Sequence, residues 1–368
     1  MIYLDNAATT YPKPLEVKEA LIKSLDEYSF NAGRGTYDSS QNTFNMIEQT
    51  REEIAKFVNA KNNRVIFTSS ATESLNMIIN GLDINDTDNI LVSPFEHNAI
   101  LRPLHLTNCK LTILKLTNNL EIDFNFLIET INSKKFKAIF LSHVSNVLGN
   151  VLCYEKVFKL CREKNIICIL DAAQSFGTIE INKEYVDFIV FAGHKCFYTP
   201  IGIAGYIYNS KVELKVAKAG GTGSDSLNLD MPNMLPYKYE CGSLPSNLIY
   251  SLNRGIDFVN NNEIKKHKEE LSYYLINKLK ELSNVVVYLV DNYTYGIVSF
   301  NVKGYTSSEV AEALANNFDI AVRSGYHCAP LIHDYIDSKK FYGTVRVSFS
   351  YFNTFDEVDY LINCLKEF

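Results

Sequence analysis

Short uncharged stretches alternate with stretches of helical periodicity along the first two hundred residues. After Ser70, for example, apolar residues recur at spacings of three and four over 75–82, which marks one face of a helix. Strands are predicted at 65–68, 90–93, 111–116, 138–142, 166–171, 186–191 and 205–208, and helices at 15–27, 99–106, 124–131 and 154–164. This alternation predicts an α/β domain with a mostly parallel sheet.

The pattern changes beyond residue 208, and a smaller α/β unit is predicted toward the C-terminus. One of its helices should begin at a capping box formed by Thr306 and Glu309. Strands are expected at 285–289, 297–302, 320–323 and 344–347, and helices at 263–282, at 307–315 and from 355 onward. We expect a large domain over residues 15–255 and a small domain formed by residues 1–14 and 256–368.

Two of the predicted buried strands end in residues that suggest chemistry. Asp171 closes one strand, and Gly193, His194 and Lys195 follow the uncharged run 188–192. A lysine at the end of a core strand can be desolvated, which lowers the pKa of its amine and makes it nucleophilic. A surface lysine at a strand end is the alternative. A lysine and an aspartate at two strand ends are also the pair that a pyridoxal phosphate (PLP) site needs, one for the aldehyde and one for the pyridinium nitrogen.

Polar residues follow other predicted strands in the same way. Thr72, the pair Glu96 and His97, and the run 143–146 each come after a strand. Because ligands of parallel α/β sheets bind beyond the carboxyl ends of the strands, these residues are expected to converge on one site. The turn before Thr72 leads into a helix N-terminus, whose free backbone N–H groups suit a phosphate. An ordinary capped helix is the alternative.

Composition narrows the classes of function. The 368 residues carry a net charge of −6, which gives no electrostatic footprint for nucleic acid or anionic lipid. No apolar stretch approaches the ~20 residues that span a bilayer, and the N-terminus lacks a signal-peptide pattern, so we expect a soluble cytoplasmic protein without a membrane partner. The eight cysteines stand singly in the sequence, which argues against a zinc site or a disulfide framework.

One cysteine lies in a loop with unusual neighbours. Cys328 follows Arg323, Gly325 and His327. A thiol near arginine and histidine on a glycine-containing loop can have a lowered pKa and react as a thiolate. The alternative is that Cys328 is a small hydrophobic residue without a chemical role.

The order of these motifs resembles the class V branch of the fold-type I PLP enzymes, and within it the cysteine desulfurases and selenocysteine lyases. The motifs are residues 3–10, 71–76, 142–146, 171–174 and 193–195, and the resemblance extends to 346–348. It implies an α/β, fold-type I PLP-dependent transferase. The large domain would hold a mostly parallel seven-stranded sheet, the smaller C-terminal domain would also be α/β, and the enzyme would be a homodimer.

The resemblance implies a role for each matching residue. Lys195 would bind PLP covalently and move a proton, Asp171 would pair with the pyridinium nitrogen, and His97 would stack on the ring. The other implied cofactor contacts are Asn146 and Gln174 near the ring oxygen, Ala71, Thr72 and His194 at the phosphate, and Gly242 and Ser243 from the partner subunit. The implied substrate contacts are Arg346, Arg323, Asn146 and Ala8.

The implied reaction converts L-cysteine to L-alanine and leaves the sulfur as a persulfide on Cys328, for transfer to an acceptor protein. Three alternatives are a selenocysteine lyase acting on L-selenocysteine, transamination or epimerisation with Cys328 as a bystander, and a non-catalytic scaffold. Intact Lys195 and Asp171 weigh against the scaffold. The sequence departs from the desulfurase pattern at Tyr37, where a histidine is common, and at Ala192, where a serine is common.

Overall fold

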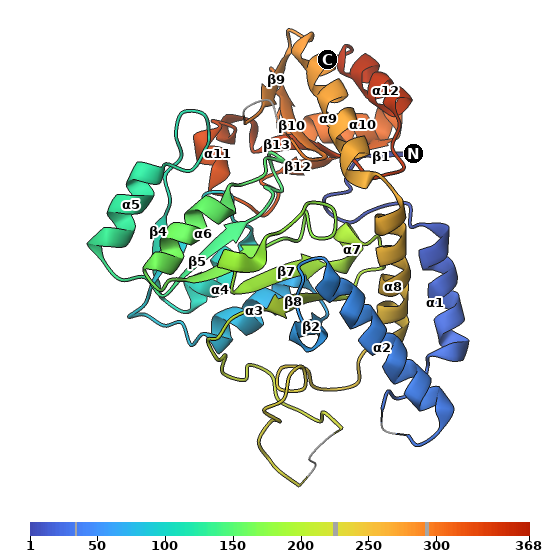
Figure 1. Cartoon of the computed structure of the whole chain (residues 1–368). Coiled ribbons are helices and arrows are strands. Elements are labelled where there is room, and N and C mark those ends of the chain that lie inside the picture. Colours follow the sequence, from blue (N-terminus) through green and yellow to red (C-terminus); the bar gives the residue numbers. More distant parts are fainter. Residues whose placement is uncertain (34, 224–226, 291–293) are drawn as a thin grey trace.

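The computed structural model describes residues 1–33, 35–223, 227–290 and 294–368. Its largest sheet has seven strands, and a second sheet of four strands lies toward the top of Figure 1. The strands of the large sheet are β2 (Val65–Thr68), β3 (Asn89–Val92), β4 (Lys110–Ile113), β5 (Ala138–Ser142), β6 (Ile167–Asp171), β7 (Phe188–Ala192) and β8 (Ala204–Tyr208).

The order of strands across the large sheet is β2-β8-β7-β6-β5-β3-β4. β8 runs antiparallel to β2 and β7, and the remaining pairs are parallel. The predicted mostly parallel seven-stranded sheet is therefore confirmed. The carboxyl ends of its parallel strands meet at one edge, as the expected convergence of polar residues requires.

Helices cover both faces of this sheet. On one face lie α3 (Ala71–Gly81) and α4 (Asn98–Leu106), and on the other α2 (Asp38–Lys56), α5 (Phe124–Ser133), α6 (Tyr154–Glu163) and α8 (Ser246–Asn261). α1 (Leu15–Glu27) packs against α8 (Figure 1). A strand covered on both faces is apolar throughout, because its side chains alternate in direction. In β7, Ile189 and Phe191 join one core, and Phe188 and Val190 join the other.

The four-stranded sheet is antiparallel and packs against three helices. Its strands, in order, are β12 (Arg323–Gly325), β13 (Thr344–Ser348), β10 (Ile297–Val302) and β9 (Val285–Tyr288). The helices are α9 (Ile264–Lys280), α10 (Ser307–Phe318) and α12 (Phe355–Leu365), which share a third core with the sheet. Thr306 and Thr354 cap α10 and α12 in capping boxes. The division into domains at residues 15 and 256 stays a prediction.

The N-terminus of the chain joins this smaller unit. β1 (Ile2–Tyr3) pairs in parallel with β11 (Ile320–Ala321). The predicted strand 320–323 is therefore two short strands, β11 and β12, which belong to different sheets. The remaining short elements are α7 (Gly193–Cys196), α11 (Ile332–Tyr335) and the 3-10 turns η1 (Asn62–Arg64), η2 (Lys183–Tyr185) and η3 (Lys339–Phe341).

Apolar periodicity does not predict α2 or α8, because polar residues occupy part of the buried face of each. The buried polar residues are Ser40, Thr43, Thr50 and Arg51 in α2, and Ser251 and Asn253 in α8. The two helices pack against each other, and residues of both line a large cavity, so both matter for the site described below.

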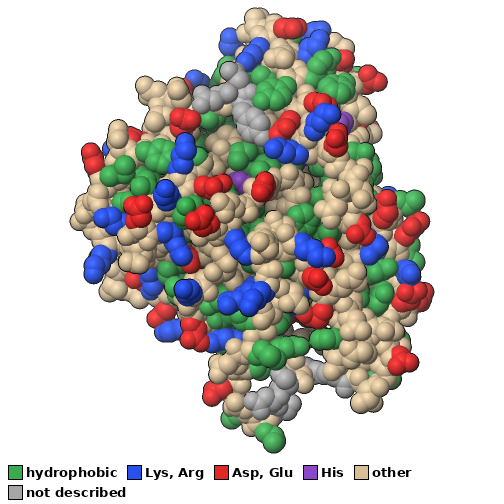
Figure 2. All heavy atoms as spheres, in the orientation of Figure 1, with side chains coloured by type: hydrophobic (Ala, Val, Ile, Leu, Met, Phe, Trp, Pro, Cys, Tyr) green, Lys and Arg blue, Asp and Glu red, His purple; other side chains and the backbone are tan. Residues whose placement is uncertain are grey.

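Basic and acidic side chains are interspersed on the face of the molecule shown in Figure 2. This mixture accords with the small net charge of −6. On this face, therefore, the surface presents no field of a single sign that would steer a charged polymer. Within the part of the chain that the structure describes, no helix combines the length and the apolar character that crossing a bilayer requires.

Gly255 lets α8 approach the backbone just beyond Lys195. A Cβ atom at this position would lie 2.0 Å from the carbonyl oxygen of Phe197. Gly255→Ala should therefore destabilise the protein by roughly 1–3 kcal/mol, because two main chains must move apart. Urea unfolding measures the change. Gly220→Ala is the control, since its Cβ would meet Cys241 at an ordinary 3.4 Å, and equal losses in both variants would contradict the prediction.

Candidate active site

The carboxyl ends of the parallel strands open on one cavity. β6 ends at Asp171, and β7 leads directly into α7, which carries Lys195. Eight of the predicted site residues line the cavity: Ala71, Thr72, His97, Asn146, Asp171, Gln174, His194 and Lys195. The structure thus brings these eight residues together, although they are spread over more than a hundred positions of the sequence. Their individual roles stay predictions.

Lys195 and Asp171 influence each other electrostatically in a desolvated part of this cavity. Burial lowers the pKa of the Lys195 amine, the Asp171 carboxylate opposes that effect, and the Arg346 cation adds to it. Burial raises the pKa of Asp171, whereas the N–H of Ala173, 3.0 Å from Oδ1, and the Lys195 cation favour the carboxylate. The amine of Lys195 therefore has a larger neutral, nucleophilic fraction than an exposed lysine.

Two histidines of the cavity are kept neutral by burial. His97 caps α4, because its Nδ1 accepts a hydrogen bond from the N–H of Ala99 at 3.0 Å. Burial, together with the Lys195 and Arg346 cations, lowers the pKa of His97 to about 4. Burial also lowers the pKa of His194 to about 4, and its Nδ1 has no hydrogen-bond partner among the described residues. This nitrogen is free to bond a ligand atom.

The first turn of α3 is the candidate phosphate site. Ser70 is the N-cap, and its side-chain oxygen accepts a hydrogen bond from the N–H of Glu73 at 3.1 Å. The N–H groups of Ala71 and Thr72 lie in the turn where a helix leaves such groups without intrahelical partners, which favours an anion. Together with a desolvated lysine and a buried carboxylate, this set of donors fits PLP.

Arg346 is buried at the edge of the same site. Its Nη1 donates to the carbonyl oxygen of Asn146 at 2.9 Å, and its Nη2 donates to Oδ1 of Asp5 at 2.8 Å. Its Nε is buried and has no hydrogen-bond partner among the described residues. Arg323 lies 3.7 Å from the other carboxylate oxygen of Asp5, and Ala8 donates its N–H to the Asp5 carbonyl at 3.1 Å. Asp5 thus lies among the predicted substrate residues, although the sequence pattern assigns it no role beyond its place in the motif of residues 3–10.

Cys328 lies on a loop that hydrogen bonds tie to the cavity. Nδ2 of Asn146 donates to the carbonyl oxygen of His327 at 2.7 Å, and the N–H of Asn98, the first residue of α4, donates to the carbonyl oxygen of Cys328 at 2.6 Å. His327 and Cys328 both have a left-handed backbone, with φ of 49° and 57°. Cys328 itself is exposed. The loop therefore presents an accessible thiol beside residues of the cavity wall.

The structure corrects the expectation that His327 supplies a positive charge near Cys328. The imidazole of His327 is buried, and its Nε2 lies 2.8 Å from Oγ1 of Thr344. Burial, reinforced by the Arg346 cation, lowers the pKa of His327 well below its ordinary value, so the ring is neutral. His327 acts instead as an anchor for the loop.

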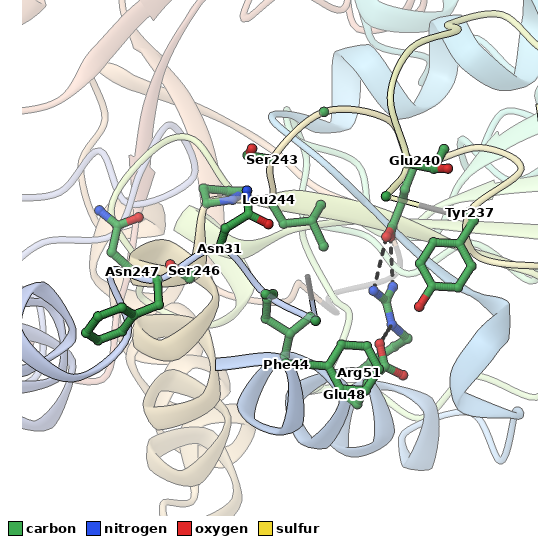
Figure 3. A pocket seen from close by; sticks show the side chains of 18 of the residues that line it. Asn31, Phe44, Glu48, Arg51, Tyr237, Glu240, Ser243, Leu244, Ser246 and Asn247 are labelled. Atoms are coloured by element: carbon green, nitrogen blue, oxygen red, sulfur yellow. Dashed lines mark hydrogen bonds and ion pairs between the residues drawn. The ribbon is translucent and has the colours of Figure 1, made fainter. Parts of the chain in front are cut away.

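Gly242 and Ser243 do not line the cavity of Lys195. Both are exposed, and they border a second cavity of about 730 Å³, shown in Figure 3. The wall of this second cavity holds an ion pair between Arg51 and Glu240. Within one chain, therefore, the structure does not bring these two predicted cofactor residues to the other eight.

Glu96 is a buried carboxyl group next to His97. Its Oε1 lies 2.5 Å from Oγ of Ser93 and 3.0 Å from the N–H of Ser142, and its Oε2 lies 2.9 Å from Oγ of Ser142. Glu96 thereby ties the end of β3 to the end of β5. Burial raises the pKa of Glu96 to about 8, so the group is mostly protonated at neutral pH.

Comparison with known proteins decides the family. The model of the family described as "Aminotransferase class-V" matches residues 2–361. The chain belongs to the aminotransferase class-V family. Within this family it belongs to the cysteine desulfurase branch, and it is an enzyme of the PLP-dependent type that characterises the family.

The relatives of this class-V chain match over nearly their whole length. A probable cysteine desulfurase of Methanothermobacter thermautotrophicus is 29% identical, with 100% of this chain and 94% of the relative covered. A probable cysteine desulfurase of Halalkalibacterium halodurans is 31% identical, with 100% and 93% covered.

Solved structures of class-V proteins agree with the fold. The apo structure of a cysteine desulfurase from Thermococcus onnurineus NA1 has a TM-score of 0.92 at 30% identity, with 100% of this chain and 94% of that chain covered. The cysteine desulfurase CsdA of Escherichia coli has a TM-score of 0.87 at 25% identity, with 99% and 94% covered. The predicted fold-type I architecture is confirmed.

Glu96 should make the stability of the folded protein depend on pH. The pKa of this carboxyl group rises from 4.5 to about 8 on folding, so between these values the folded state holds a proton that the unfolded state has released. The contribution of Glu96 to the free energy of unfolding is therefore fully present below pH 4.5 and is lost as the pH rises to about 8. Glu96→Gln removes this loss, because glutamine does not titrate.

The stability of Glu96→Gln relative to the wild type should accordingly increase with pH between 5 and 8. The slope should be at most about 1.4 kcal/mol per pH unit for one proton. Urea unfolding of the apo proteins at three pH values measures it, with Glu129→Gln at an exposed position of α5 as the control. A constant difference between Glu96→Gln and the wild type across this range would show that Glu96 does not hold the proton.

Proposed function

We propose that the protein is a PLP-dependent cysteine desulfurase, which converts L-cysteine to L-alanine and carries the removed sulfur as a persulfide on Cys328 to an acceptor protein. One observation carries the proposal: Asn146, which lines the cavity of Lys195, donates a hydrogen bond of 2.7 Å to the loop of Cys328. This contact supports a thiol working at the mouth of a cavity with a desolvated lysine. The names of the curated relatives support the same reaction.

PLP, when bound, would supply an electron sink for bond cleavage next to the α-carbon of the substrate. We assign its covalent attachment to Lys195, the pyridine nitrogen to Asp171 and the ring face to His97. The remaining assignments are Asn146 and Gln174 for the ring oxygen, and Ala71, Thr72 and His194 for the phosphate. The unpartnered Nδ1 of His194 and the first-turn N–H groups of α3 support this phosphate assignment.

The residues of the chain would share the reaction as follows. Arg346 would bind the substrate carboxylate through its unpartnered Nε–H, with Arg323 adding positive charge beside it. Nζ of Lys195 would take the α-proton and later return a proton to the product. The Cys328 thiolate would attack the substrate sulfur, so that an S–S bond forms while the C–S bond of the substrate breaks. The products would be alanine and a persulfide on Cys328.

We further propose that the enzyme is a cytoplasmic homodimer in which Gly242 and Ser243 approach the cofactor of the partner subunit. Both residues are exposed and separate from Lys195 within one chain, which supports a role across a subunit boundary. Ser243 would offer a hydroxyl group to the phosphate. L-Selenocysteine is a second substrate to test, and quantifying alanine with sulfide or selenide from each amino acid decides the preference.

Asp171→Asn should retain PLP but slow the release of alanine by at least about tenfold, or ~1.4 kcal/mol in activation free energy. A neutral amide no longer stabilises a protonated pyridine, so removal of the α-proton becomes harder. Steady-state alanine production and the absorbance spectrum of the bound cofactor measure the two effects separately. Wild-type turnover in a variant saturated with PLP would remove Asp171 from this role.

Cys328→Ser should abolish most alanine release from L-cysteine, by more than about 100-fold, while leaving PLP bound. The reason is that the serine hydroxyl does not act as a sulfur nucleophile near neutral pH. Mass spectrometry of the wild type after brief exposure to L-cysteine should find one added sulfur on Cys328. Cys153→Ser is the matched control, because Cys153 is also exposed but lines a different cavity. Wild-type alanine release from Cys328→Ser would overturn the persulfide mechanism.

A further inference from the structure

A buried ion pair in the wall of the second cavity has no role in the reaction described so far. Arg51 of α2 and Glu240 form two hydrogen bonds, Nη1 to Oε1 at 2.7 Å and Nη2 to Oε2 at 3.0 Å (Figure 3). Their side chains are 1% and 5% exposed. A paired charge this deep in the protein contributes little net stability compared with apolar residues of similar size, so stability alone does not account for it.

The same two side chains occupy the free edge of β2. Nη1 of Arg51 also donates to the carbonyl oxygen of Val65 at 2.6 Å, and the N–H of Phe67 donates to Oε1 of Glu240 at 2.6 Å. Among the strands that the structure describes, β2 pairs with β8 alone, along its other edge. The ion pair therefore replaces a missing neighbouring strand, and it fixes β2 relative to α2 and to the segment that carries Glu240.

Each of the two segments held by this pair leads to a predicted phosphate contact. β2 ends at Thr68, and the chain then turns into the first turn of α3, with Ala71 and Thr72. Glu240 stands two residues before Gly242 and three before Ser243. The Arg51–Glu240 pair thus holds two segments that lead to predicted phosphate contacts. One contact would be to the cofactor of the same chain, and the other to the cofactor of a partner.

We propose that Arg51 and Glu240 are positioning residues for the phosphate group of PLP, acting through β2 on the first turn of α3 and through residues 240–243 on the phosphate in the partner subunit. Both parts of the proposal rest on the proposed function, since the first requires the first turn of α3 to hold the phosphate and the second requires Ser243 to approach the partner's cofactor. Neither side chain lines the cavity of Lys195, so neither is expected to touch the reacting atoms.

The test compares PLP with pyridoxal, which carries the same aldehyde and ring but no phosphate. Apo wild type and apo Glu240→Gln are titrated with each compound, and absorbance and fluorescence report binding. Glu240→Gln should weaken PLP binding by at least tenfold and change pyridoxal binding by less than twofold. A general structural defect would weaken both compounds alike, and that result would overturn the proposal.

Asp187→Asn is the matched control. Asp187 is also buried, pairs with Arg162 at 2.8 Å and accepts the N–H of Cys168 at 2.9 Å, but it lies at the amino ends of the strands. Its substitution should leave the ratio of PLP to pyridoxal affinity unchanged. A ratio that falls equally in Asp187→Asn and Glu240→Gln would overturn the proposal, because any buried carboxylate would then have the same effect.

A double variant covers the case in which Glu240→Gln does not fold. Arg51→Met with Glu240→Met removes both charges of the buried pair and also the bonds to Val65 and Phe67. Glu48, which pairs with Nε of Arg51 at 3.1 Å, keeps its charge, but its side chain is 28% exposed and stays partly solvated. The folded double variant should again lose PLP affinity at least tenfold with little change for pyridoxal. If the double variant unfolds in urea as cooperatively as the wild type and its ratio of PLP affinity to pyridoxal affinity is unchanged, the proposal is overturned.

Mixed dimers separate the two effects proposed for the pair, one through β2 on the first turn of α3 and one through residues 240–243 on the partner subunit. One subunit carries Lys195→Ala, so that the dimer holds a single covalent PLP site, and Glu240→Gln is placed in either subunit. Weaker PLP binding should result from both placements, through α3 in one case and through residues 240–243 in the other. A wild type that binds no PLP would overturn the proposed function and this proposal with it, whereas a wild type that binds PLP with a variant of unchanged ratio would overturn this proposal alone.

Discussion

The ion pair between Arg346 and Asp5 joins the parts of the chain that form the site. Arg346 belongs to β13 of the small sheet, Asp5 follows the N-terminal strand, and the second hydrogen bond of Arg346 goes to Asn146, beyond the end of β5 in the large sheet. Asn146 in turn holds the carbonyl of His327. A buried guanidinium needs such partners, and these two leave only Nε unpaired among the described residues.

The sequence predicts the large sheet well because its strands are covered on both faces. Such strands are short uncharged runs, like the one that ends at Ala192, and this pattern is easily recognised in a sequence. Helices α2 and α8 escape prediction because their buried faces include polar groups, Arg51 and Asn253 among them, whose partners lie far away in the sequence. The run 320–323 reads as one strand because two short strands of different sheets follow each other with hardly a break.

Some residues of the candidate site can be predicted from the sequence and others cannot. Residues at or just beyond the carboxyl end of a strand, such as Asp171 and Lys195, are predictable because the direction of the strand fixes where they lie. Residues whose importance depends on burial are not, since a buried charge and an exposed charge look alike in a sequence. His327 is the clearest case: its position beside Cys328 suggests a cation, but its ring is buried against Thr344 and neutral. Asp5 and Glu240 likewise gain their meaning only from the arginines that they meet.

Burial also determines how the phosphate group of PLP would have to be recognised. It lowers the pKa of the Lys195 amine and brings the pKa of the His194 imidazole to about 4, which weakens the positive charge that these two side chains can offer an anion. Recognition then depends on backbone N–H groups and on the helix dipole, whose effect falls off within one turn. A lysine on a long side chain can follow a displaced anion, but a backbone N–H moves only with its segment. A phosphate site that relies in part on main-chain donors therefore requires that β2 and its neighbours be held rigidly, and the bonds that Arg51 and Glu240 make to the free edge of β2 meet that requirement.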